Sequence, residues 1–188
     1  MEPSDDDLMA ASALGDRDAF GALYRRRRPD IYRFAYHMTG SRAAAEDIAQ
    51  EVFLIVTREA GRYRAGTSGV VPWLLGIARN LVRRHGAQRG WEPLEAAHEP
   101  PVVPGDPVVR DEEMMRLRAA LLALPRRYRE PLVLCDLQEL SYADAASAIG
   151  CAVGTVRSRL HRARARLAGQ LRCPPARESR TVVPKWIL

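Results

Sequence analysis

SYADAASAIGCAVGTVRSRLHRARARL, residues 141–167, is the stretch of this chain that decides its fold. Its first half repeats apolar residues with the i, i+3, i+4, i+7 spacing of an amphipathic helix, at Tyr142, Ala145, Ala146 and Ile149. Ser141 and Asp144 have the spacing of a capping box, and Gly150 is a residue type that ends helices. The second half carries another apolar stripe, formed by Val156, Leu160, Ala163 and Leu167. The stretch therefore predicts two packed helices joined by a tight turn.

The face of the second helix opposite its apolar stripe is small and basic. It consists of Gly154, Ser158, His161, Arg162 and Ala165, with Thr155 and Arg157 on its flanks. Two helices packed in this way can place the second one in a DNA major groove, where small residues permit close approach. Arginine side chains then neutralise phosphates or bind guanine with two hydrogen bonds. The pattern predicts DNA binding.

The alternative to a DNA-binding helix is an amphipathic helix whose arginines only face solvent. A solvated face usually mixes charges of both signs. Here no acidic residue follows Asp144 within the stretch, whereas five arginines do. This imbalance favours contact with an anionic partner.

The composition of the whole chain agrees with a nucleic-acid partner. At 188 residues and 47% hydrophobic content, the chain can bury one moderate core or two small ones, and its net charge is +6. No apolar run approaches the length of a membrane span, and residues 1–7 are acidic and do not resemble a secretion signal. We therefore expect no membrane insertion and a cytoplasmic location.

The cysteines and histidines do not predict a metal or a cofactor. Cys135, Cys151 and Cys173 are widely separated and odd in number, so we expect reduced thiols, two of them half-buried. The four histidines lack the spacing of metal ligands, and no nucleophile, base and orienting group occur together. The sequence therefore predicts a protein that is not an enzyme.

The rest of the chain predicts an all-α fold with two small helical domains. After a short acidic leader, we expect Asp16 to cap a first helix that ends at the run Arg25–Arg28, and Pro29 to begin a second helix that closes at Gly40. Ser41 is expected to cap a third helix, and Pro72 to begin a fourth. The expected boundaries are a helical bundle at 16–86, an acidic proline-rich linker at 87–110, a four-helix unit containing the helix-turn-helix at 111–170, and a mobile tail at 171–188. The acidic linker predicts either a shield that repels duplex DNA or an inert spacer.

Four motifs in this order resemble the extracytoplasmic-function (ECF) sigma factors of bacterial RNA polymerase. They are AEDIAQEVF at 45–53, PWLLGIARNLVRRH at 72–85, LPRRYREPLVL at 124–134 and GTVRSRLHRARARL at 154–167. The resemblance covers residues 18–85 and 114–167. It implies core RNA polymerase and promoter DNA as partners, and members of this family are often held inactive by an anti-sigma factor.

The resemblance also assigns roles to three groups of residues. Those implied to bind the polymerase are Asp47, Gln50, Glu51 and Phe53. Those implied to recognise and melt the minus-10 element are Tyr63, Arg79, Asn80, Arg83 and Arg84. Those implied to read the minus-35 element as duplex are Gly154, Thr155, Arg157, Ser158, His161 and Arg162. For Trp73, a place in the core and a role in base stacking both remain open.

A second function class is compatible with the basic helix. A one-component repressor has an N-terminal domain for ligand binding or dimerisation and a C-terminal helix-turn-helix that binds a palindrome. Such a protein does not need the arginines and asparagine at 79–84. Copurification with core polymerase distinguishes the two classes, because a repressor binds duplex DNA alone as a dimer.

The start of the arginine helix lacks a capping side chain. Ala152 precedes Val153, where the family often has a serine that caps the helix. We expect Ala152→Ser to raise the free energy of unfolding by about 1 kcal/mol or less, because the serine oxygen accepts a backbone hydrogen bond of the first turn. Thermal unfolding checks this, and an unchanged or lowered melting temperature contradicts the helix start.

Overall fold

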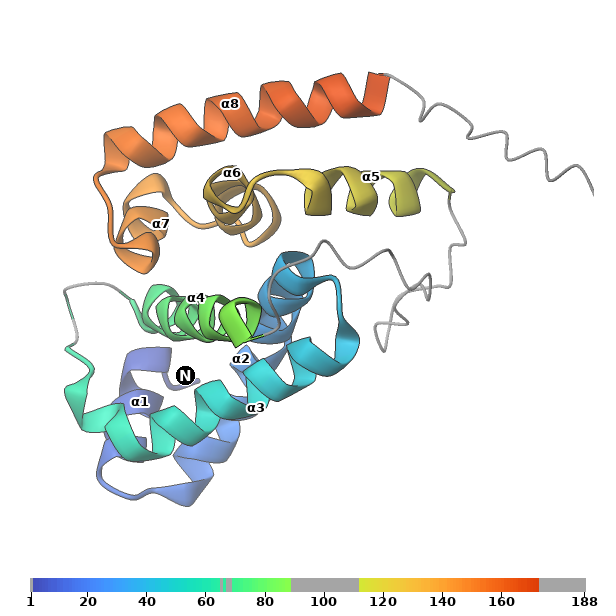
Figure 1. Ribbon diagram of the computed structural model, residues 1–188. Coiled ribbons are helices and arrows are strands. Elements are labelled where there is room, and N and C mark those ends of the chain that lie inside the picture. Colours follow the sequence, from blue (N-terminus) through green and yellow to red (C-terminus); the bar gives the residue numbers. More distant parts are fainter. Residues whose placement is uncertain (1, 65, 67–68, 89–111, 173–188) are drawn as a thin grey trace, which may run out of the picture.

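The computed structural model describes residues 2–64, 66, 69–88 and 112–172, and the elements in these ranges are helical (Figure 1). The first group contains α1 (Asp5–Ala13), α2 (Arg17–Thr39), α3 (Arg42–Glu59), the 3₁₀ turn η1 (Ala60–Arg62) and α4 (Val70–Gln88). The second contains α5 (Glu112–Ala123), α6 (Arg126–Leu132), the π-helical turn η2 (Val133–Leu137), α7 (Tyr142–Ile149) and α8 (Val153–Arg172). The predicted all-α class is confirmed. Most of the predicted linker and tail lies outside the described residues, but 87–88 and 171–172 are helical.

Helix α1 occupies part of the stretch that the sequence predicts as an acidic leader, so that prediction is wrong. Ser4 and Asp7 form a capping box. Three aspartates lie in the first turn, where their negative charges interact favourably with the positive end of the helix dipole. Leu8 and Met9 are buried against the bundle. The capping pattern was visible in the sequence, but the short helix has almost no amphipathic periodicity.

Helix α2 passes through Pro29 without a break, which corrects the prediction of two helices. Proline inside a helix removes one hydrogen bond and costs roughly 3 kcal/mol. Buried side chains on both sides of Pro29, Leu23 and Ile31 among them, belong to the same core. The arginines that were expected to end the helix are also held, since Arg26 and Arg27 both pair with Asp5. Packing and these ion pairs offset the local cost.

The predicted caps and helix ends elsewhere are confirmed, but α4 begins at Val70, two residues before the predicted start at Pro72. The side chains of Asp16, Ser41 and Ser141 accept hydrogen bonds from the first turns of α2, α3 and α7. Gly40 and Gly150 adopt the left-handed conformation at the ends of α2 and α7. Pro125 precedes α6, and the chain changes to the π-helical turn two residues after Pro131. Proline thus divides this segment, as expected.

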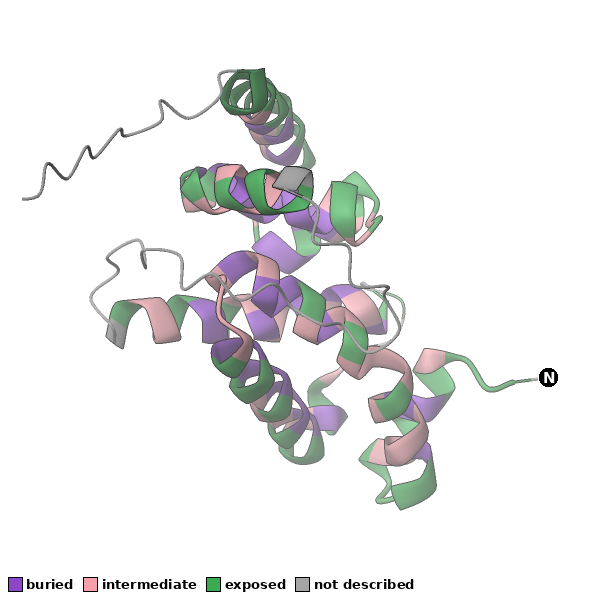
Figure 2. Cartoon of the chain, turned by 90° about the vertical axis from the view of Figure 1, so that its right-hand side faces the viewer, coloured by how far each residue is buried: buried purple, intermediate pink, exposed green. Residues whose placement is uncertain are grey.

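The two helical groups pack directly on each other. Their buried side chains form one continuous hydrophobic cluster, which runs along the inner faces of the helices (Figure 2). Helix α7 lies against α4, where Gly76 faces the backbone of Ala148. Helix α8 lies on the outer side of the second group, away from α4 (Figure 1). The arginine helix is therefore open while α4 is largely covered.

The end of α2 is a second point of contact between the groups. Leu122 of α5 lies beside Gly40, and the guanidinium carbon of Arg118 is 4.5 Å from the centroid of the Tyr36 ring. Arg129 of α6 is 2% exposed and donates a hydrogen bond of 2.7 Å to the carbonyl oxygen of Met38. The same guanidinium also donates to the carbonyls of Leu122 and Leu124. One buried charge thus binds three backbone acceptors, of which the Met38 carbonyl lies across the contact.

His37 of α2 makes the free energy of unfolding depend on pH. Burial, together with the positive charges of Arg118 and Arg33, lowers the pKa of His37 from 6.5 to about 4. Between pH 6.5 and about pH 4, His37 is protonated in the unfolded chain but stays neutral in the folded chain. The free energy of unfolding is therefore highest above pH 6.5 and decreases as the pH falls through this range. We expect the free energy of unfolding to fall by about 2 kcal/mol from about pH 7.5 to pH 5.

Urea unfolding at a series of pH values measures this loss. The matched variant His37→Gln has no titrating group at this position, so its stability should change much less over the same interval. An equal pH dependence in the two proteins would contradict the role of His37.

Candidate nucleic-acid interface

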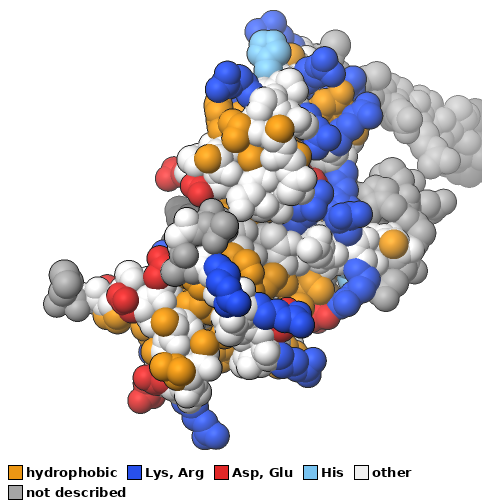
Figure 3. Space-filling model, turned by 90° about the vertical axis from the view of Figure 1, so that its left-hand side faces the viewer, with side chains coloured by type: hydrophobic (Ala, Val, Ile, Leu, Met, Phe, Trp, Pro, Cys, Tyr) orange, Lys and Arg blue, Asp and Glu red, His pale blue; other side chains and the backbone are white. Residues whose placement is uncertain are grey.

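Helix α8 presents the predicted DNA-reading face to solvent. It begins at Val153, with the Ala152 carbonyl accepting from Thr155 and Val156 at 2.9 and 3.2 Å. Val156, Leu160 and Ala163 are buried. The opposite residues are exposed, namely Gly154, Arg157, Ser158, His161 and Arg162, while Thr155 is half-buried at the edge. Basic side chains gather over this end of the molecule (Figure 3). The structure thus places all six predicted minus-35 residues on one accessible side of one helix.

Arg164 is the arginine of α8 that an acid neutralises. Its Nη2 lies 2.6 Å from Asp136 Oδ1, and its Nε donates to the second carboxylate oxygen at 3.0 Å. This two-pronged hydrogen bond raises the pKa of Arg164. Arg164 therefore holds α8 to η2, and its charge is compensated.

The predicted minus-10 residues of α4 have different surroundings. Asn80 and Arg83 are exposed. Arg84 is also exposed but pairs with Glu51 of α3. Arg79 is turned toward the second helical group, where its Nε lies 3.1 Å from Glu130 Oε2, and the two side chains are only 17% and 5% exposed. In this arrangement Arg79 is not open to DNA.

Tyr63 lies at the other end of α4. Its ring meets Trp73 edge to face, with centroids 5.6 Å apart, and its hydroxyl donates to the carboxylate of Asp6. Burial and this acid raise the pKa of Tyr63. Trp73 is half-buried against the core, so it packs with the bundle and also contacts Tyr63. The helical rise places Trp73 about 15 Å from Arg83, so the predicted minus-10 residues extend along the helix.

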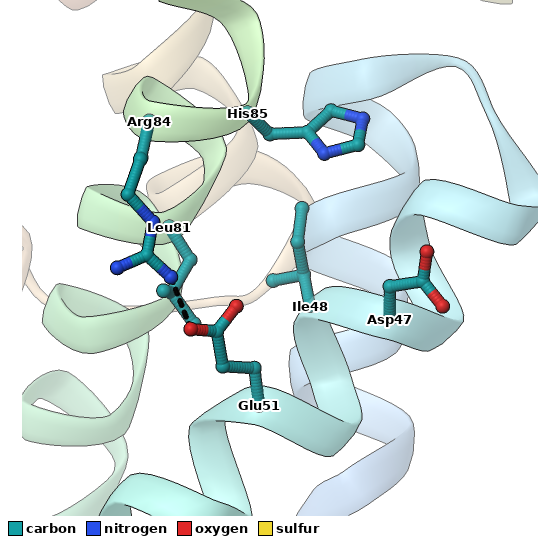
Figure 4. Close-up of a pocket in the computed structure, with 6 residues that line it drawn as sticks. All are labelled: Asp47, Ile48, Glu51, Leu81, Arg84 and His85. Atoms are coloured by element: carbon teal, nitrogen blue, oxygen red, sulfur yellow. Dashed lines mark hydrogen bonds and ion pairs between the residues drawn. The ribbon is translucent and has the colours of Figure 1, made fainter. Parts of the chain in front are cut away.

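The predicted polymerase-binding residues divide between surface and core. Asp47 and Glu51 of α3 line a hollow together with Leu81, Arg84 and His85 of α4 (Figure 4). Gln50 lies with Asp47 and Glu51 on the same face of α3, beside a second hollow. Phe53 is 3% exposed and packs edge to face on Phe20 and Tyr24. The three polar residues are therefore available for contact in this arrangement, while Phe53 supports the bundle.

Sequence reasoning missed the acidic partners of these residues. Asp6 lies in the stretch that the sequence predicts as an acidic leader, and Glu130 lies in the motif at 124–134, to which the sequence assigns no ion pair. Glu130 also accepts from Arg126 Nε at 2.7 Å. The spacing of Arg126 and Glu130, one helical turn apart, was the available signal. The pairing with Arg79 had no local signal, because 51 residues separate the two.

Comparison with known proteins agrees with this arrangement. The profile described as Sigma-70 region 2 matches residues 23–92, and that described as Sigma-70, region 4 matches residues 114–167. The ECF RNA polymerase sigma factor SigM of Mycobacterium tuberculosis is 37% identical over 170 residues, covering 89% of this chain and 84% of SigM. The chain belongs to the ECF sigma factors. SigE of Mycolicibacterium smegmatis, another ECF sigma factor, is 37% identical over 91% of this chain and 70% of its own length.

Two solved structures have the same fold as this sigma factor. The sigma factor RpoE of Bartonella quintana, in complex with the anti-sigma factor NepR, has a TM-score of 0.67 at 28% identity, covering 81% of this chain and 96% of RpoE. CnrH, in complex with the cytosolic domain of CnrY, shows the same fold with a TM-score of 0.70 at 24% identity, covering 89% and 97% of the two chains. The two Sigma-70 region matches and the ECF relatives favour a promoter-recognising sigma factor over the repressor alternative.

Two further features concern the described residues of the sigma factor. No helix among them is long and apolar enough to cross a membrane. Cys135 and Cys151 are half-buried free thiols, as expected, and burial raises the pKa of Cys135 to about 11. Cys173 lies outside the described residues.

The ion pair of Glu130 should stabilise the contact between the two helical groups. Glu130→Gln leaves the guanidinium of Arg79 largely buried without a countercharge. We expect this change to lower the free energy of unfolding by about 3 kcal/mol, measured by urea unfolding of the full chain. The matched control is Glu51→Gln, whose pair with Arg84 is 44% and 57% exposed on its two sides. Exposed pairs contribute less than about 1 kcal/mol, so equal losses would contradict the prediction.

Proposed function

We propose that this ECF sigma factor grips core RNA polymerase with α3, reads the melted minus-10 element with α4 and the segment before it, and reads duplex minus-35 DNA with α8. Its general function, promoter recognition for transcription initiation, follows from its family. The proposed grip on the polymerase uses the shared face of Asp47, Gln50 and Glu51.

The exposed face of α8 is the observation that carries this proposal. Small residues at its start permit close approach to base edges, and Arg157 and Arg162 stand beside them. A guanidinium binds guanine or a phosphate with two hydrogen bonds. Because the packing face of α8 is buried and the reading face is not, the helix can enter a major groove without unfolding.

Reading of the minus-10 element by α4 requires a change in arrangement. Arg79 is held by Glu130, and α7 covers α4. We therefore propose that binding to the polymerase separates α4 from α6 and α7. Asn80, Arg83 and Arg84 are exposed already and lie where they can track a single-stranded backbone. Tyr63 would supply the aromatic surface against which an unstacked base rests.

The remaining functional proposals follow the family. The polymerase performs the chemistry, and this chain selects the site, so we propose no catalytic activity for it. We propose a cytoplasmic location. RpoE and CnrH were solved with NepR and CnrY, and we propose that a protein of the anti-sigma type binds this chain as well.

In vitro transcription tests the proposed function. Core polymerase with the full-length chain should start transcripts at defined sites in a genomic promoter library. Arg162→Ala should lower that initiation by about tenfold, since one good two-pronged contact is worth about 1–3 kcal/mol. Arg164→Ala is the matched control, because it removes an arginine of the same helix that Asp136 already neutralises. Absence of defined transcripts with the unaltered chain contradicts the sigma function, and equal activity of the two variants contradicts the role of Arg162.

A further inference from the structure

A buried tyrosine gathers three exposed arginines beside α8. Tyr128 of α6 is 6% exposed. The guanidinium carbons of Arg127 and Arg166 each lie 4.9 Å from the centroid of its ring. Interaction of its hydroxyl with the Arg162 guanidinium is the main reason why the pKa of Tyr128 is lowered. Two separate helices thus bring three guanidinium groups around one side chain.

The charge of this cluster is not compensated. Within the described part of the chain, no carboxylate forms an ion pair with Arg127, Arg162 or Arg166, whereas Arg164 and Arg79 both have one. Three guanidinium groups around one ring repel each other. The negative face of the tyrosine ring offsets only part of this, since an exposed cation–π contact is worth about 0.5–1 kcal/mol. A bound anion would relieve the remaining repulsion.

We propose that Tyr128 positions Arg127, Arg162 and Arg166 as a clamp for the phosphates of duplex DNA beside the bases that α8 reads. This inference rests on the proposed function of α8 and extends it to α6. Arg162 belongs to both surfaces, so the clamp is continuous with the reading face. Arg166 follows one helical turn later, about 6 Å along the axis.

The chemistry of the cluster favours DNA over an acidic protein surface. All three arginines are exposed and their shared neighbour is buried, so the surface they present is charged and not apolar. Stable protein interfaces have an apolar core inside a polar rim. Phosphate backbones, in contrast, are bound by arginine forks with no apolar contact. Tyr128 is a positioning residue, because its ring and hydroxyl hold the forks in place before DNA arrives.

Salt-dependent binding of the full-length chain to duplex DNA tests the clamp. The probe is a fluorescent duplex of about 20 base pairs with arbitrary sequence, since phosphate contacts do not depend on sequence. Binding is measured by anisotropy titrations over a series of NaCl concentrations. In the double variant Arg127→Ala, Arg166→Ala, the negative slope of log K, where K is the association constant, against log[NaCl] should become smaller in magnitude by about 2. Tyr128→Phe keeps the ring but loses the acceptor for Arg162, so binding should weaken by about threefold with an unchanged melting temperature.

Two controls separate the clamp from general effects. Arg164→Ala should change the slope by less than about 0.5, because Asp136 already compensates its charge. Replacing Arg127 and Arg166 together by lysine should restore most of the slope, since the charges return, although the forks are lost. A structural role for the arginines would not give this rescue.

Each outcome bears on the clamp. An unaltered chain that binds no duplex, or a double alanine variant with the original slope, overturns it. An original slope combined with weaker binding to core polymerase would mean that the arginines contact an acidic protein, which overturns it as well. A reduced slope in a chain that directs no transcription keeps the clamp as a DNA site and rejects the sigma function instead.

Discussion

The buried guanidinium of Arg129 is the interaction on which this arrangement depends. It is 2% exposed and donates to the backbone carbonyls of Met38 at the end of α2, Leu122 in the last turn of α5, and Leu124 in the turn before α6. Burial lowers the pKa of Arg129 to about 10, so the group stays charged at neutral pH. A charged group in such a place is tolerated only when acceptors surround it. The carbonyls at the end of α2 lack helical partners and carry partial negative charge, so they suit this cation.

The next residue makes the complementary contact. Glu130 accepts from Arg79 of α4, so adjacent residues of α6 hold two different helices of the first group. Glu130 and Arg79 are thereby paired where the apolar surfaces of α4 and α7 are buried. The consequence is an asymmetry between the two helices that are proposed to read DNA. Helix α8 lies on the outer side of the second group (Figure 1), and its Arg157 and Arg162 are exposed. Helix α4 lies against the second group, and its Arg79 is held there by Glu130.

Charge compensation divides the arginines of the chain into two classes. Arg79, Arg84 and Arg164 have acidic partners and hold elements together. Arg127, Arg162 and Arg166 share a tyrosine and pair with no carboxylate among the described residues, so their charge is available to an external anion. Helix periodicity assigns arginines to faces, but it does not say which of them find a carboxylate. The net charge of +6 therefore does not distinguish arginines that are paired with acids from arginines that can bind an external anion.

The sequence by itself determined the helices that have strong periodicity, the caps at Asp16, Ser41 and Ser141, and the exposed face of α8. These follow from local chemistry, because capping residues and spacing of three or four residues act within one or two turns. Only the tertiary structure decided that α2 continues through Pro29, that Phe53 is buried, and that Arg79 meets Glu130. These outcomes depend on partners far away in the chain, such as Asp5 for the arginines before Pro29 and α6 for Arg79. Local propensity is worth a few kcal/mol at most, and burial or pairing across the core exceeds it.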